Sequence, residues 1–353
     1  MKFSFFTGMG YAIGQKSRDW PVPPSRHLQE NVQLGFDRAF GLFRLADSLG
    51  FDWVATPEHH FKPYLASNPM LTAAALSQIG LRAKVAILGV VATGRDPITV
   101  AEDAATVDQM LGGRFVIGLL RGFPVEQLTF GVTPAQRRAL YEETVELILA
   151  AWEENEVFNW EGTYFRRGPI GVWPRAFNGV RPETLIAASN EADVDFAARL
   201  RLSIGMGHLP VADAAVLAER YRAAAANAGW TPTPDNIVYH CEIHVAETDK
   251  LCDEQIAQYG LGFLPDGLGA RGVAGQRLRR AMNEPEEKHS DTAQNVLRFW
   301  GSPETMVDKL AAAQEAIGFG VINVIFQGLR VPPEIGRGSI ELFGHEVMPQ
   351  LRG

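Results

Sequence analysis

A strand-like run at residues 51–56 ends on the polar sequence Glu58-His59-His60, which holds the clearest candidates for chemistry in the chain. An imidazole has an unperturbed pKa of about 6.5, so one of these histidines could accept a proton at neutral pH. Neighbouring residues of an extended chain point to opposite faces, which makes it difficult for both histidines to bind one metal ion. No HxH or HxxxH spacing and no matching carboxylate cluster supports a metal site. A proton acceptor and a pair of structural histidines remain as the two interpretations.

Two further segments carry groups that could bind an anion. Arg121 directly follows an apolar run and precedes Gly122, a residue that lets a ligand approach the backbone closely. Ser189 and Asn190 come at the start of a predicted helix, where a hydroxyl, backbone N–H groups and the positive end of the helix dipole favour phosphate. These residues indicate a phosphate or a phosphorylated cofactor, while an arginine after a strand serves as often as a salt-bridge partner.

Apolar runs with the length of strands alternate with helical periodicity along the chain. The apolar runs predict eight strands, at residues 2–7, 51–56, 84–91, 115–119, 184–189, 202–206, 237–246 and 321–326. The periodic segments predict helices at residues 32–49, 69–82, from 97, 134–154, 191–200, 211–228, 248–258, 302–318 and 334–350. On the first helix, the predicted buried face holds Phe36, Ala39, Phe40 and Phe43.

Eight alternations of strand and helix favour an α/β fold of the (β/α)₈ TIM-barrel type over an open sheet. The carboxyl ends of barrel strands meet at one face, so we expect the histidines, Arg121 and Ser189 to lie near one another. Residues 156–166 predict an excursion hairpin, and residues 260–295, which lack periodicity, predict an irregular lid insertion. No linker divides the chain, so we expect one domain over residues 1–353.

Composition excludes several classes of protein. The net charge is −8 with scattered Lys and Arg, so there is no basic field to hold nucleic acid. No stretch approaches the ~20 apolar residues of a membrane helix. The two cysteines, Cys241 and Cys252, form no CxxC pair, which argues against a disulfide framework or a zinc ribbon and favours the reducing cytoplasm.

Three blocks of the chain resemble bacterial-luciferase-like, flavin-dependent monooxygenases. They are LADSLGFDWVATPEHHF (45–61), DPITVAEDAATVDQMLGGRFVIGLLRGF (96–123) and WGSPETMVDKLAAAQEAIGFGVINVIFQ (300–327). The resemblance implies a TIM barrel that binds reduced FMN, which a separate NAD(P)H-dependent flavin reductase supplies. It also implies that O₂ adds to the flavin to give a C4a-peroxyflavin, which oxygenates a small, largely apolar organic substrate. A homodimer is expected from the same resemblance.

The resemblance also implies roles for single residues. His59 matches the family's active-site base near the flavin C4a edge. The residues that match the family's FMN-phosphate site are Arg121, Arg138 and Ser189. Leu88-Gly89 falls where relatives have a cis peptide beneath the flavin ring. We expect three neighbouring residues of the same barrel face to contact the cofactor as well, namely Glu58, Asn190 and His208.

Some positions depart from the luciferases proper. Ala188 stands in place of a glutamate, Leu120 in place of a reactive cysteine, and His208 near the position of a tryptophan. These departures argue against light emission from a long-chain aldehyde. Two alternatives use the same barrel: a hydride-transfer enzyme dependent on the deazaflavin F420, and a non-catalytic flavin-binding protein. The net charge disfavours the acidic tail of F420, and the histidine and arginine set disfavours the second alternative.

Overall fold

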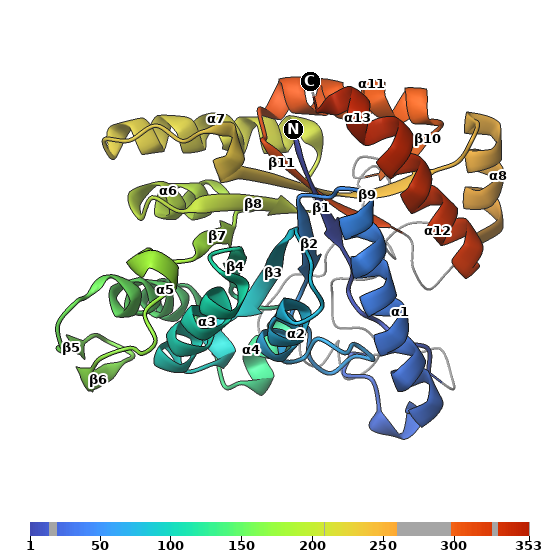
Figure 1. Cartoon of the computed structure of the whole chain (residues 1–353). Helices are drawn as coiled ribbons and strands as arrows, with labels where there is room; N and C mark the ends of the chain where they lie inside the picture. Colours follow the sequence, from blue (N-terminus) through green and yellow to red (C-terminus); the bar gives the residue numbers. More distant parts are fainter. Residues whose placement is uncertain (14–19, 208, 260–297, 327–330, 353) are drawn as a thin grey trace.

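Eight parallel strands close into a barrel in the computed structural model, which describes residues 1–13, 20–207, 209–259, 298–326 and 331–352 (Figure 1). The order around the barrel is β9-β11-β1-β2-β3-β4-β7-β8, and pairing of β8 with β9 closes the ring. The predicted (β/α)₈ barrel is therefore confirmed. The predicted lid at 260–295 and His208 lie outside the described residues.

The strands form two sheets. The barrel consists of β1 (Lys2–Phe6), β2 (Trp53–Thr56), β3 (Lys84–Val91), β4 (Phe115–Leu120), β7 (Glu183–Ala187), β8 (Ser203–Gly207), β9 (Ile237–Val245) and β11 (Val321–Phe326). A short strand, β10 (Arg298–Gly301), extends the sheet along the carboxyl half of β9. The predicted hairpin is present as β5 (Phe158–Glu161) and β6 (Arg166–Ile170).

Helices follow the strands and surround the barrel (Figure 1). They are α1 (Gln29–Ser48), α2 (Pro69–Ser77), α3 (Pro97–Leu111), α4 (Pro124–Thr129), α5 (Arg137–Glu153), α6 (Glu191–Arg199), α7 (Val211–Asn227), α8 (Asp249–Tyr259), α11 (Pro303–Ile317), α12 (Pro333–Leu342) and α13 (Met348–Leu351). A π-helical turn at Phe343–Val347 joins the last two helices. None of the helices in the described part of the chain has both the length and the apolar character to span a bilayer.

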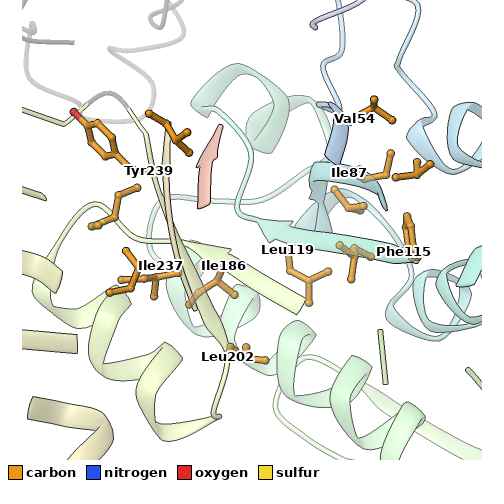
Figure 2. Close-up of a cluster of buried hydrophobic side chains, with 14 of the residues drawn as sticks. Val54, Ile87, Phe115, Leu119, Ile186, Leu202, Ile237 and Tyr239 are labelled. Atoms are coloured by element: carbon orange, nitrogen blue, oxygen red, sulfur yellow. The ribbon is translucent and has the colours of Figure 1, made fainter. Parts of the chain in front are cut away.

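Strand residues alternate between the barrel interior and the layer under the helices. The interior cluster draws residues from six strands: Trp53, Ala55, Ala86, Val116, Leu185, Val238 and Val321. Other strand residues belong to the larger cluster, which also contains residues of the helices, and Figure 2 labels Val54, Ile87, Phe115, Leu119 and Ile186 among its buried side chains. Most strand positions on both faces are therefore apolar, which explains the apolar runs in the sequence, while β1, β9 and β11 also carry buried polar residues such as Ser4, Glu242 and Asn323.

Helix boundaries near the candidate site follow from local capping. The Asn190 side chain accepts a hydrogen bond from the backbone N–H of Asp193 and so begins α6. Asp96 begins α3 in the same way, with Pro97 in its first turn. These helices start directly after the carboxyl ends of β7 and β3, which places their amino ends at the predicted functional face.

One sequence-based expectation about the helices is wrong. Phe36 was expected on the buried face of α1, but 41% of its surface is exposed, while Ala39 and Phe43 are buried as expected. The final helix, expected at about 334–350, is present over 333–351 and contains the π-helical turn.

Candidate functional site

His59 lies in the loop after β2, inside a group of aromatic side chains. Its ring packs against Trp20, Tyr64 and Phe123, with ring centroids 6.3, 5.3 and 5.5 Å away. Its Nδ1 atom lies 3.7 Å from Oε1 of Glu126, just beyond hydrogen-bond distance. That nitrogen is buried and has no hydrogen-bond partner among the described residues. The ring is therefore held by packing, with a carboxylate facing one of its two nitrogens.

Glu126 is fully buried on α4, and its carboxylate is fixed by the backbone. Oε2 accepts a hydrogen bond of 2.8 Å from the N–H of Phe123, and Oε1 accepts one of 2.9 Å from the N–H of His60. Burial would raise the pKa of this carboxyl, but the adjacent His59 ring and the two backbone N–H groups lower it below its usual value. Glu126 therefore presents a negative charge to the imidazole at neutral pH.

Effects of opposite sign act on the pKa of the imidazole. Burial lowers the pKa of His59 below 6.5, the nearby Glu126 raises it, and the positive charge of Lys62 lowers it. Lys62 is itself mostly buried, and this burial lowers the pKa of its ammonium group to about 8. The Nζ atom of Lys62 lies 3.7 Å from the centroid of the Trp20 ring, a cation–π contact. His59 is therefore neutral at pH 7, as a proton acceptor must be.

His60 points to different partners from His59. Its Nε2 atom lies 2.7 Å from Oε1 of Glu58, and its ring packs edge-on against Phe130. The divergence of the two histidines agrees with the argument against a shared metal ion. Within the described ranges, no three His, Cys, Asp or Glu side chains are grouped closely enough to hold a metal.

Glu58 joins the ends of β2 and β3. Its buried carboxylate accepts hydrogen bonds from Nε and Nη2 of Arg95, at 2.9 and 2.7 Å, and one of 2.8 Å from the backbone N–H of Val91. The backbone N–H of Glu58 donates to the carbonyl of Gly89. Each of these partners belongs to the protein, so the contact of Glu58 with a cofactor stays a prediction.

The Leu88-Gly89 peptide is cis, as the resemblance implies. At this point β3 shifts register against β4, and the backbones approach so closely that a Cβ atom on Gly89 would lie 2.2 Å from the carbonyl oxygen of Gly118. Only glycine fits there. The structure places this dipeptide within β3, next to the carboxyl end that Glu58 holds; its contact with a flavin stays a prediction.

The predicted phosphate-binding residues converge on one carboxylate, that of Asp193 in the first turn of α6. Arg121 donates through Nη2 to Oδ2 of Asp193 at 3.1 Å, and Arg138, on α5, donates through Nη1 to Oδ1 at 3.2 Å. The backbone N–H and the hydroxyl of Ser189 donate to Oδ2 at 3.1 and 3.3 Å. The side-chain amide of Asn190 adds a bond of 2.9 Å. The predicted residues therefore come together around an anion of the protein itself.

The segment after β4, residues 121–126, which includes the first turn of α4, joins this cluster to the histidine. Arg121 begins the segment and binds Asp193, whereas Phe123 stacks on His59 and Glu126 faces its Nδ1 atom. The carbonyl of Arg121 accepts hydrogen bonds from Thr93 and Gln127, which hold the segment against the end of β3. The imidazole and the anion-binding group are thus connected through one short segment of the chain.

The donor set of the cluster suits a phosphorylated ligand. Two guanidinium groups, a hydroxyl and a backbone N–H group already bind an oxyanion, the carboxylate of Asp193. The same kinds of donor bind phosphate at helix amino ends. At the other contact of the 121–126 segment, the mostly buried, neutral imidazole of His59 lies among aromatic rings and can accept a proton where bulk water is largely excluded.

Sequence reasoning missed several residues of this site, among them Trp20, Lys62, Glu126 and Asp193. An acidic residue in the first turn of a helix was the available signal for Glu126 and Asp193, but such residues commonly only complement the helix dipole.

Comparisons with known proteins agree with this architecture. The model of the luciferase-like monooxygenase family matches residues 10–319. The alkanal monooxygenase alpha chain of Photobacterium leiognathi is 24% identical over 348 residues, which cover 94% of this chain and 96% of that protein.

Two solved structures share the fold. One is the oxygenating constituent of 3,6-diketocamphane monooxygenase from Pseudomonas putida, a type II Baeyer-Villiger monooxygenase in complex with FMN, with a TM-score of 0.78 and 20% identity over 99% of this chain and 98% of that one. The other is an F420-dependent secondary alcohol dehydrogenase, with a TM-score of 0.73 and 16% identity over 100% of this chain and 99% of that one. Since the family match spans most of the sequence, the chain belongs to the luciferase-like monooxygenase family.

Proposed function

We propose that the protein is the oxygenating component of a two-component monooxygenase. It takes reduced FMN from a separate NAD(P)H-dependent flavin reductase and uses O₂ to oxygenate a small, largely apolar organic substrate. The observation that carries the proposal is the 121–126 segment, which joins an oxyanion-binding group at Arg121 to a mostly buried, neutral imidazole at His59. A phosphorylated flavin needs both kinds of contact, one for its phosphate and one beside its ring.

The phosphate would be held by Arg121, Arg138 and Ser189. Arg121 is the most available of the three, because Arg138 also donates to the carbonyl of Ala192 and pairs with Glu142. Ser189 contributes both a hydroxyl and a backbone N–H at the amino end of α6. These contacts would hold the phosphate end of the cofactor at the barrel mouth and would not involve its ring.

His59 would move a proton next to the flavin ring. Because Glu126 faces Nδ1, the opposite nitrogen, Nε2, is the one left for a ligand. A negative carboxylate beside the ring stabilises the protonated imidazole that forms when His59 accepts a proton. The surrounding rings of Trp20, Tyr64 and Phe123 would keep water away and accommodate an apolar substrate. The oxygen chemistry itself would come from the bound reduced flavin.

An anaerobic titration with reduced FMN, followed by a pulse of O₂, tests this function. We expect saturable binding, a transient change in flavin absorbance after the pulse, and an oxygenated product from a panel of small apolar substrates. His59→Ala should lower turnover by about 10²–10⁴-fold if the imidazole is a positioned base. His60→Ala is the matched control, since its ring faces Glu58 instead. Failure to bind reduced FMN, or binding without product for any substrate in the panel, would remove the proposal.

The fold shared with an F420-dependent dehydrogenase defines the alternative cofactor. Affinities for FMN, reduced FMN and F420 should be measured side by side on the same preparation. We expect the FMN forms to bind more tightly. Tight F420 binding with hydride transfer in the absence of O₂ would favour the deazaflavin alternative, and tight binding of oxidised FMN without turnover would favour a flavin-binding protein.

A further inference from the structure

We propose that Asp193 is an internal anion that competes with the flavin phosphate for its binding site. In this proposal the carboxylate fills the oxyanion position of the free protein, the phosphate displaces it, and the competition keeps the affinity for FMN low. This inference rests on the proposed flavin function, which it deepens by naming the residue that sets cofactor affinity.

The geometry around Asp193 is that of a filled oxyanion site. The carboxylate is 4% exposed and receives hydrogen bonds from two guanidinium groups, a hydroxyl, a side-chain amide and a backbone N–H. Oδ2 alone takes four of these bonds, from Arg121, Asn190 and both donors of Ser189. The donors that would bind a phosphate are therefore already directed at the protein's own carboxylate.

A structural role in capping α6 does not account for all of these contacts. The cap itself is the bond from the backbone N–H of Asp193 to the side chain of Asn190, which does not use the Asp193 carboxylate. The two arginines come from elsewhere in the fold, Arg121 from the end of β4 and Arg138 from α5. Both guanidinium groups contact one buried carboxylate, which partly neutralises their positive charges while no phosphate is bound.

Phosphate and the Asp193 carboxylate cannot both take the donors of Ser189 and Arg121 in the positions they now occupy. Like charges at hydrogen-bonding distance repel strongly in a partly buried site, so a bound phosphate requires the carboxylate to turn away. Breaking the Asp193 contacts costs free energy, and this cost makes the net free energy of phosphate binding less favourable. A cofactor that is delivered reduced and leaves oxidised, as proposed above, needs such reversible binding.

The test is the affinity of Asp193→Asn and Asp193→Ser for FMN, riboflavin and inorganic phosphate, by fluorescence quenching and calorimetry. Both variants should bind FMN and inorganic phosphate about tenfold more tightly than the wild type, while binding of riboflavin, which lacks phosphate, stays unchanged. Asp195→Asn is the matched control, because Asp195 lies on the same helix and pairs with Arg220 instead. It should leave all three affinities unchanged.

Thermal melting of the free protein supplies a readout that does not depend on flavin. Loss of the carboxylate removes the ion-pair partner of Arg121 and one of the two carboxylate partners of Arg138, so the variants should melt at a lower temperature, and inorganic phosphate should raise their melting temperature more than that of the wild type. In a crystal structure of the wild type with FMN, the Asp193 carboxylate should no longer contact Ser189 and Arg121. This measurement does not require the variants to fold.

Each result has a separate meaning for the two proposals. Tighter phosphate binding by the variants without any FMN binding would support the role of Asp193 and remove the flavin function. Unchanged or weaker FMN and phosphate binding by both variants would show that Asp193 supports the arginines instead of competing with phosphate. A wild-type FMN complex in which the carboxylate keeps all its contacts would overturn the inference equally.

Discussion

The buried carboxylate of Glu58 gives the sharpest stability prediction, that of the substitution Glu58→Gln. The side chain of Glu58 is 1% exposed and that of Arg95 is 22% exposed. The substitution removes the negative charge, turns one oxygen into a donor and leaves Arg95 without its ion-pair partner. It also weakens the bond to Val91, which joins β2 to β3, and the bond to His60 within the loop after β2.

The expected loss is about 2–4 kcal/mol of unfolding free energy. Breaking a fully buried ion pair costs ~3–5 kcal/mol, because one charge is left without compensation. Arg95 lowers that figure, since it is partly solvated and has a second acceptor in the carbonyl of Ser67, 3.3 Å away. The matched control is Glu183→Gln, because Glu183 pairs with Lys84 at a site where both side chains are about one-third exposed. Such a partly solvated pair is worth about 1 kcal/mol or less.

Urea unfolding followed by circular dichroism measures both variants. We expect the midpoint to fall clearly for Glu58→Gln and slightly for Glu183→Gln, with an unchanged dependence on urea concentration. A double-mutant cycle with Arg95→Met should show that the combined loss is smaller than the sum of the two single losses. If Glu58→Gln is within about 0.5 kcal/mol of its control, the assignment of Glu58 as the link between β2 and β3 is refuted.

Further predictions concern the imidazole and the β3–β4 contact. The neutral imidazole should be lost only as pH falls through the lowered pKa of His59, so activity that needs it should decline on the acid side, below pH 6.5. In an NMR titration of this histidine, Glu126→Gln should lower its pKa further and Lys62→Met should raise it; shifts of the same sign would contradict the electrostatic account. Gly89→Ala should cost at least about 2 kcal/mol of unfolding free energy, because its Cβ would overlap a backbone carbonyl. Gly41→Ala, where nothing lies within 4 Å, should instead stabilise α1 by up to about 1 kcal/mol, and equal effects of the two substitutions would contradict the packing argument.

The barrel could be predicted from the sequence because its strands are buried on both faces. Lys84–Val91 is almost continuously apolar, and the predicted bounds of this strand agree with those of β3. Short elements were not predictable in the same way. The six residues of α4 give too short a window for a periodic pattern, and the four residues of β10 acquire strand structure only by pairing with β9.

The candidate site was only partly predictable, because its polar contacts are made between distant parts of the chain. The convergence of Arg121 and Ser189 followed from the rule that strand ends share one face of a barrel. That Asp193 would occupy their centre could not be read from the sequence, since it depends on the position of an arginine 72 residues away. The pairing of Glu126 with His59 likewise depends on how the loop after β4 folds over the loop after β2.

The most direct test of the flavin site is the difference in affinity between FMN and riboflavin, measured for the wild type and for Arg121→Gln. The account predicts that the wild type binds FMN more tightly than riboflavin, and that Arg121→Gln removes most of this difference while riboflavin affinity is retained. Equal affinities of the wild type for the two flavins, or an Arg121→Gln variant that still prefers FMN to the same degree, would contradict it.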